Sequence, residues 1–252
     1  MKPRCIVDWR QVGLATLLSC SLAVGQQSPN GQVKQSYDAG DPAAIAVARR
    51  AIDENTAMFG PNSQQTAISL NNLGILLRNS GDLKSAESLL QRAVQILITT
   101  SSESPDLASA MTNLGTVMEA EGNFGEAEGL YQKALSISKL VYGPRHPAVG
   151  SVLQRLGHLY YETQRYGQAQ ATLREALAVN EAALGPVDIT TARILVDLAR
   201  TSAKMGNSEN ANVYLAQAAR ILKSISESGQ CGSNSSVSTC RDADALRREI
   251  GN

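Results

Sequence analysis

The segment Leu70-Asn71-Asn72-Leu73-Gly74 has three counterparts further along the chain. They are Met111-Thr112-Asn113-Leu114-Gly115, Leu153-Gln154-Arg155-Leu156-Gly157 and Leu195-Val196-Asp197-Leu198-Ala199. The last residues stand at positions 74, 115, 157 and 199, so the steps are 41, 42 and 42 residues. Two sets of alanines keep these steps: Ala86, Ala127, Ala169 and Ala211, and then Ala93, Ala134, Ala176 and Ala218. Self-similarity at one such period predicts an array of repeated supersecondary units.

Each unit is expected to contain two helices. In the first unit, Leu70, Leu73 and Leu77 follow helical spacing, and Ser80-Gly81-Asp82 is a turn signal. A second helix is expected from about residue 83 to residue 98. Glycine in the first helix and the two alanines in the second let the paired helices pack closely. The sequence therefore predicts an all-α fold, an α-solenoid of stacked helical hairpins.

The same period predicts how the rest of the chain is organised. Subtracting 42 from the positions of Ala86 and Ala93 gives Ala44 and Ala51, so residues 41–59 are expected to be the second helix of an incomplete repeat that caps the array. Four hairpins are expected over residues 60–226. Residues 227–252 are expected to form a loop with two cysteines and a short charged helix.

These motifs resemble the tetratricopeptide repeat family. The Leu-Gly pair and the two alanines fall at the family's spacing, and the longer period with Tyr142-Gly143-Pro144 in a connection resembles the kinesin light chain-like branch. The pattern is weaker in the fourth unit, where Asp197 and Ala199 replace Asn and Gly. The connection over 101–105 has no Gly-Pro. The resemblance implies that the α-solenoid is right-handed and that the first helices line an inner face where protein partners bind.

Residues 1–25 have the layout of a secretory signal peptide. Lys2, Arg4 and Arg10 precede an apolar run over 12–22, and Ala23-Val24-Gly25 is a small-residue cleavage site. The alternatives are an N-terminal membrane anchor, a buried helix, and lipoprotein processing at Cys20, which would attach the protein to a membrane. Residues 26–40 are expected to be a disordered leader. The product would be periplasmic or secreted, where Cys231 and Cys240 are expected to form a disulfide.

Composition and motifs favour binding over catalysis. The chain has 23 basic and 23 acidic side chains, and this zero net charge disfavours a nucleic-acid partner. There is no phosphate loop, zinc-binding helix motif or nucleophile elbow, so neither an enzyme nor a cofactor is expected. His158 and Glu162 lie four residues apart on one helical face, which favours a side-chain hydrogen bond over a metal site.

The resemblance assigns the binding surface to polar residues of the first helices. Arg78 and Arg155 suit a carboxylate, Glu119 suits a basic group and Tyr161 offers a stacking surface. An extended peptide is expected to bind mainly at the second and third units. The alternatives are a merely solvated face, and self-assembly or oligomerisation within an envelope complex. The predicted residues are Asn71, Asn72, Arg78, Thr112, Asn113, Glu119, Gln154, Arg155, His158, Tyr161, Asp197 and Arg200.

Overall fold

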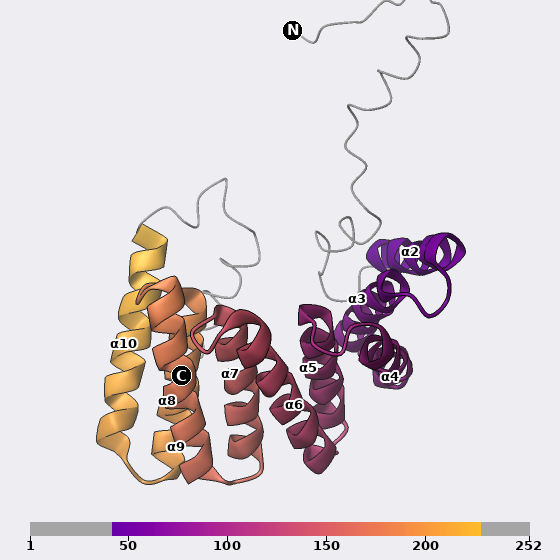
Figure 1. Cartoon of the computed structure of the whole chain (residues 1–252). Coiled ribbons are helices and arrows are strands. Elements are labelled where there is room, and N and C mark those ends of the chain that lie inside the picture. Colours follow the sequence, from indigo (N-terminus) through magenta and orange to yellow (C-terminus); the bar gives the residue numbers. More distant parts are fainter. Residues whose placement is uncertain (1–41, 228–252) are drawn as a thin grey trace, which may run out of the picture.

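A computed structural model describes residues 42–227 of the chain, and Figure 1 shows this part as helices that follow one another side by side. The described residues form nine helices and no strand. The helices are α2 (Pro42–Phe59), α3 (Gln64–Ser80), α4 (Leu83–Thr100), α5 (Pro105–Ala120), α6 (Phe124–Tyr142), α7 (Pro147–Glu162), α8 (Tyr166–Leu184), α9 (Ile189–Lys204) and α10 (Ser208–Glu227). The expected signal peptide over 1–25, Cys20, the leader over 26–40 and the loop with Cys231 and Cys240 lie outside the described residues.

The helices pack in the order of the chain. α3 packs on α4, α5 on α6, α7 on α8 and α9 on α10, and each hairpin also contacts the next one. α2 packs on α3 as a single helix, with Ala44 and Ala51 buried in the contact. The all-α solenoid of helical hairpins expected from the sequence is thereby confirmed.

The array curves with its first helices on the inner side. Cα atoms of α3 and α5, of α5 and α7, and of α7 and α9 come within 8 Å of each other. Among the described helices, no two second helices from neighbouring hairpins approach so closely. Helices that are closer together lie on the inside of a curve, so α3, α5, α7 and α9 form the inner surface.

Short polar residues and positive backbone angles determine where the helices begin and end. The side chains of Ser63 and Ser104 accept hydrogen bonds from backbone N–H groups at the start of α3 and α5. Gly122 closes the second hairpin with a φ of 82°. The third hairpin has Gln164 at the equivalent position with a φ of 60°, the only positive φ at a non-glycine residue in the described part. This turn is therefore strained relative to its glycine counterparts.

Glycine in the first helices allows the two helices of a hairpin to cross closely. A Cβ added at Gly74 would lie 2.7 Å from Leu90 Cγ, and one at Gly157 would lie 2.6 Å from Leu173 Cγ. Both distances are shorter than real Cβ atoms accept. The alanines expected to let the second helices approach, such as Ala86 and Ala127, are fully buried. The structure thus confirms close crossing as the reason for the repeating small residues.

Candidate functional site

The candidate site is the inner surface of α3, α5, α7 and α9, and all of the predicted binding residues lie on these helices. Hydrogen bonds between neighbouring first helices organise this surface. Asn113 Nδ2 donates to Asn71 Oδ1 at 2.9 Å, and Gln154 Nε2 donates to Asp197 Oδ2 at 3.0 Å. These amides were expected to bind a partner's main chain. In the structure each of them forms at least one hydrogen bond to another side chain of the protein itself. The surface is therefore partly pre-organised before any partner binds.

At its N-terminal end the structure differs from the surface expected from the sequence. Asn71 is only 9% exposed and Asn72 only 3%, although both were expected to face an open groove. They are covered because α4 and α5 close around them. The two asparagines line a small hollow of about 220 Å³, the α3–α5 hollow, together with Ile68, Ile75, Leu97, Asp106 and Ser109.

Three further predicted residues make contacts within their own hairpins. Thr112 Oγ1 donates to the carbonyl of Ala108 at 2.7 Å. Tyr161 is half-buried and meets Tyr166 edge to face, with ring centroids 5.7 Å apart. The guanidinium of Arg78 donates twice to Asn79 Oδ1, at 3.2 Å and 2.8 Å. Burial lowers the pKa of Arg78, and the nearby charge of Arg155 lowers it further.

A chain of polar contacts connects the second and third hairpins across the inner surface. Tyr131 of α6 donates its hydroxyl proton to Glu119 Oε2 at 2.7 Å, and His158 Nδ1 lies 2.8 Å from Glu119 Oε1. His158 Nε2 is 3.8 Å from Glu162 Oε1. The Glu119 side chain is 12% exposed and that of His158 is 44% exposed. The hydrogen bond to Glu119 raises the pKa of His158 against the opposing effect of burial.

Burial also raises the pKa of Tyr131, and the negative charge of Glu119 raises it further. The tyrosine therefore stays protonated and acts only as a hydrogen-bond donor to Glu119. Its role is to hold the carboxylate at a fixed place between α5, α6 and α7.

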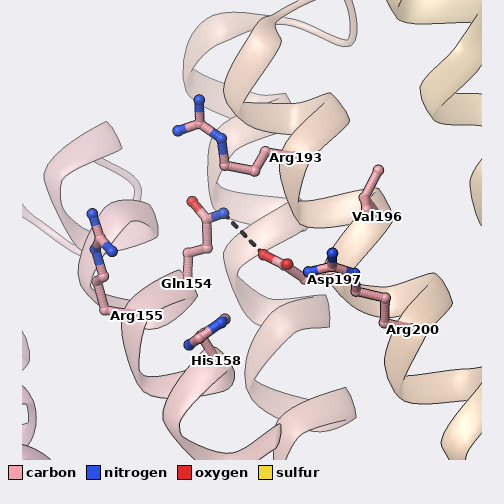
Figure 2. A pocket seen from close by; sticks show the side chains of 7 residues that line it. All are labelled: Gln154, Arg155, His158, Arg193, Val196, Asp197 and Arg200. Atoms are coloured by element: carbon pink, nitrogen blue, oxygen red, sulfur yellow. Dashed lines mark hydrogen bonds between the residues drawn. The ribbon is translucent and has the colours of Figure 1, made fainter. Parts of the chain in front are cut away.

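The larger hollow lies between α7 and α9 and has a volume of about 360 Å³. Figure 2 shows the side chains of this α7–α9 hollow, with a dashed line for the hydrogen bond from Gln154 to Asp197. The hollow is polar and carries more positive than negative side chains. Its lining residues are Gln154, Arg155, His158, Arg193, Val196, Asp197 and Arg200.

Five of these lining residues were among the predicted binding residues. The sequence placed the centre of binding between the second and third units, whereas the hollow lies between the third and fourth units. The prediction placed binding near Asn113, Arg155 and Tyr161, and of these only Arg155 lines the α7–α9 hollow. Arg193 was missed because the prediction began at the repeat signature, although Arg193 precedes Asp197 by one helical turn on the same face. Tyr131 was missed because it belongs to a second helix. Its side chain reaches Glu119 through the space left by Gly115.

The described part offers neither a metal centre nor a membrane span. Over residues 42–227, no group of three or more His, Cys, Asp or Glu side chains is placed to hold a metal ion. None of the helices in that range is long and apolar enough to cross a membrane.

The fold and the inner surface define a class of protein: an α-helical repeat solenoid with a polar groove along its first helices. The sequence matches the tetratricopeptide repeat family over residues 37–99, 106–182 and 156–224, and the chain belongs to this family. Sequence comparison with curated proteins finds no match.

Solved structures of similar fold include BtubC (BKLC) from P. vanneervenii, with a TM-score of 0.67 and 22% identity over 79% of this chain and 77% of that one. Kinesin light chain TPR-like repeats from Podosopora anserina have a TM-score of 0.60 and 19% identity, over 82% of this chain and 92% of that one. MamA has a TM-score of 0.56 and 15% identity, over 79% of this chain and 96% of that one. At these identities the likeness concerns the fold, and it confirms the expected similarity to kinesin light chain-like repeats.

Proposed function

We propose that this protein is a non-catalytic scaffold that binds an extended segment of another protein along its inner groove. We further propose that the α7–α9 hollow holds an acidic group of that segment. Membership of the tetratricopeptide repeat family supports the general role, because such arrays present extended concave binding surfaces.

The observation that carries the second proposal is the set of cations around one hollow. Arg155, Arg193 and Arg200 all line it, together with His158, and Asp197 is the one acidic side chain in the lining. A guanidinium is planar and presents paired N–H donors that match the two oxygens of a carboxylate. Because the whole chain has zero net charge, this concentration of positive charge is local to the hollow.

The direct test uses a fluorescent, N-terminally acetylated octapeptide with two adjacent aspartates among alanines and serines. Its partner probe has asparagines in place of the aspartates. In fluorescence anisotropy, we expect the aspartate peptide to bind more tightly and its affinity to fall with salt, because charge attraction is screened. Binding of both peptides with equal affinity would contradict the proposed carboxylate site.

Arg155→Ala and Arg92→Ala form a matched pair of variants for this assay. Arg155 lines the hollow, whereas Arg92 lies on the second helix α4, where its Nη2 donates to the carbonyl of Pro61 at 3.4 Å. We expect Arg155→Ala to weaken binding by about 1–2 kcal/mol, roughly five- to thirtyfold, through loss of a charged hydrogen bond. Arg92→Ala is expected to bind like the wild type. Equal losses in the two variants would place the binding surface elsewhere.

We also propose that the protein acts outside the cytoplasm. The basic start, the apolar run over 12–22 and the small residues Ala23-Val24-Gly25 support this. Mass spectrometry of the protein from its native cells should find Gln26 as the first residue, or a lipid on an N-terminal Cys20. Soluble protein that retains Met1 would contradict export by either route.

A further inference from the structure

We propose that the α7–α9 hollow takes up a proton together with its acidic ligand, and that the imidazole of His158 holds this proton. This inference rests on the proposed binding of an acidic segment in the same hollow. It adds that binding strength depends on pH in the neutral range, although neither the arginines nor the ligand carboxylates titrate there.

His158 lies where three helices bring carboxylates together. Glu119 approaches from α5 at 2.8 Å from Nδ1, and Glu162 approaches from α7 at 3.8 Å from Nε2. The negative charge of Asp197, on α9, also favours the protonated imidazole. From α6, Tyr131 acts only through its hydrogen bond to Glu119. The ring also lines the hollow, so it is close to any ligand bound there.

The two ring nitrogens have different roles in this arrangement. A neutral imidazole keeps one N–H donor, and Nδ1 can use it for the hydrogen bond to Glu119. Nε2 would then carry a lone pair within 3.8 Å of Glu162, and a carboxylate can only accept hydrogen bonds. Protonation turns Nε2 into a positively charged donor. The proton that is gained or lost near neutral pH is therefore the one on Nε2.

The charge balance around the hollow depends on that proton. Arg155, Arg193 and Arg200 contribute three positive charges, and Glu119, Glu162 and Asp197 contribute three negative charges, so the sum without His158 is zero. Protonated His158 makes the sum +1. Arg78 of α3 lies outside the lining, and its positive charge repels that of Arg155. The guanidinium of Arg78 donates hydrogen bonds to Asn79. An acidic ligand is therefore attracted more strongly when His158 is charged than when it is neutral.

The direction of the pH effect follows from this arrangement. The pKa of His158 is raised by its hydrogen bond to Glu119, and an acidic ligand beside the ring raises it further. Binding of acidic ligands is therefore strongest below the pKa of His158 in the free protein and weakens as pH rises through it. Because the site is partly open to solvent, we expect a two- to fivefold loss of affinity, on the order of one exposed charge pair.

The test measures the Kd of the acetylated aspartate octapeptide from about pH 6 to about pH 9 at constant ionic strength, a range in which the arginines and the peptide carboxylates keep their charge. We expect the wild-type affinity to fall by two- to fivefold. His158→Gln replaces the imidazole with a neutral amide that cannot titrate, so its affinity should be independent of pH and close to the wild-type value at high pH. A pH-independent wild-type Kd, or a His158→Gln variant with the wild-type pH dependence, would overturn the proton coupling and leave the carboxylate site standing. Absence of binding at every pH would overturn both proposals.

Histidine NMR provides a readout that does not need a folded variant. The chain has two histidines, and His146 lies outside the hollow as an internal reference. Saturating aspartate peptide should raise the titration midpoint of His158, whereas the His146 resonance should not respond to the peptide. Equal shifts of both resonances, or no shift of His158 while the peptide is bound, would rule out His158 as the coupled group.

Discussion

Gly115→Ala tests how the hairpin core and the polar surface depend on each other. A Cβ at this position would lie 2.7 Å from Cε1, 2.9 Å from Cδ1 and 3.2 Å from Cζ of Tyr131. Tyr131 is fully buried, and its hydroxyl donates to Glu119 at 2.7 Å. The ring therefore cannot move away from a new methyl group without straining or breaking that hydrogen bond.

The expected magnitude is the balance of three terms. Overpacking of a close helix crossing costs about 1–3 kcal/mol. Loss of a hydrogen bond to a charged acceptor costs about 1.5–3 kcal/mol. Alanine regains about 1 kcal/mol because it is a better helix former than glycine. The net loss of stability is therefore about 1.5–5 kcal/mol, which for a domain of this size lowers Tm by at least about 3 °C.

Thermal melting followed by circular dichroism measures this effect, with Gly129→Ala as the matched control. Gly129 lies on α6 in the same hairpin, and a Cβ added there has no neighbouring atom within 4 Å. The control should gain about 0.5–1 kcal/mol from helix propensity alone. If Gly115→Ala melts at or above the wild-type temperature, the crossing is not as tight as the structure indicates and the reasoning is refuted.

Three further changes test individual features of the fold. Asn180 is fully buried in α8, and no other residue within 42–227 forms a hydrogen bond with its Oδ1 or Nδ2. Asn180→Leu, which places the same residue type there as buried Leu97 of an earlier repeat, should therefore increase the stability measured by urea denaturation by about 1–2 kcal/mol, and a decrease would show that the amide is satisfied. Gln164→Gly should increase the free energy of unfolding by about 0.5–1 kcal/mol and thereby raise Tm, because glycine adopts a φ of 60° without strain. An unchanged or lower Tm would mean that the turn is not strained. Because the pKa of His158 is raised on folding, its stabilising charge is fully present below the unfolded pKa of about 6.5 and is lost as pH rises through the folded pKa. The difference in stability between wild type and His158→Gln should therefore be largest in mild acid and fall to a constant value in mild alkali, and a difference that does not change with pH would contradict the ion pair with Glu119.

The fold could be predicted because one local contact recurs in the first three of the four units. The crossing of a first-helix glycine over a second-helix side chain appears three times, at Gly74, Gly115 and Gly157. Each occurrence uses nearly the same sequence spacing, so periodicity in the sequence reports the packing directly. Subtraction of the period also pointed to Ala44 and Ala51 of α2, which are 4% and 2% exposed.

The binding surface could be predicted only as far as its helices. Residue types there change from one unit to the next, so the period says which face a residue lies on and not which neighbour it contacts. Asn113 pairs with Asn71 over 42 residues, whereas Gln154 pairs with Asp197 over 43 residues. These pairings depend on how each hairpin is turned relative to the next, which a single sequence does not specify.

The contrast between the two hollows shows why this matters for function. The α3–α5 hollow has Asp106 as its one charged lining residue, and its asparagines are buried. The α7–α9 hollow occupies a similar place two units later, yet it has three arginines and a histidine that pairs with a carboxylate of the preceding unit. Units built on one backbone plan therefore differ in the charge of their inner surface. Under the proposed function, the acidic residues of a ligand in the groove would bind at the third and fourth units and thereby determine both which ligand binds and where it lies.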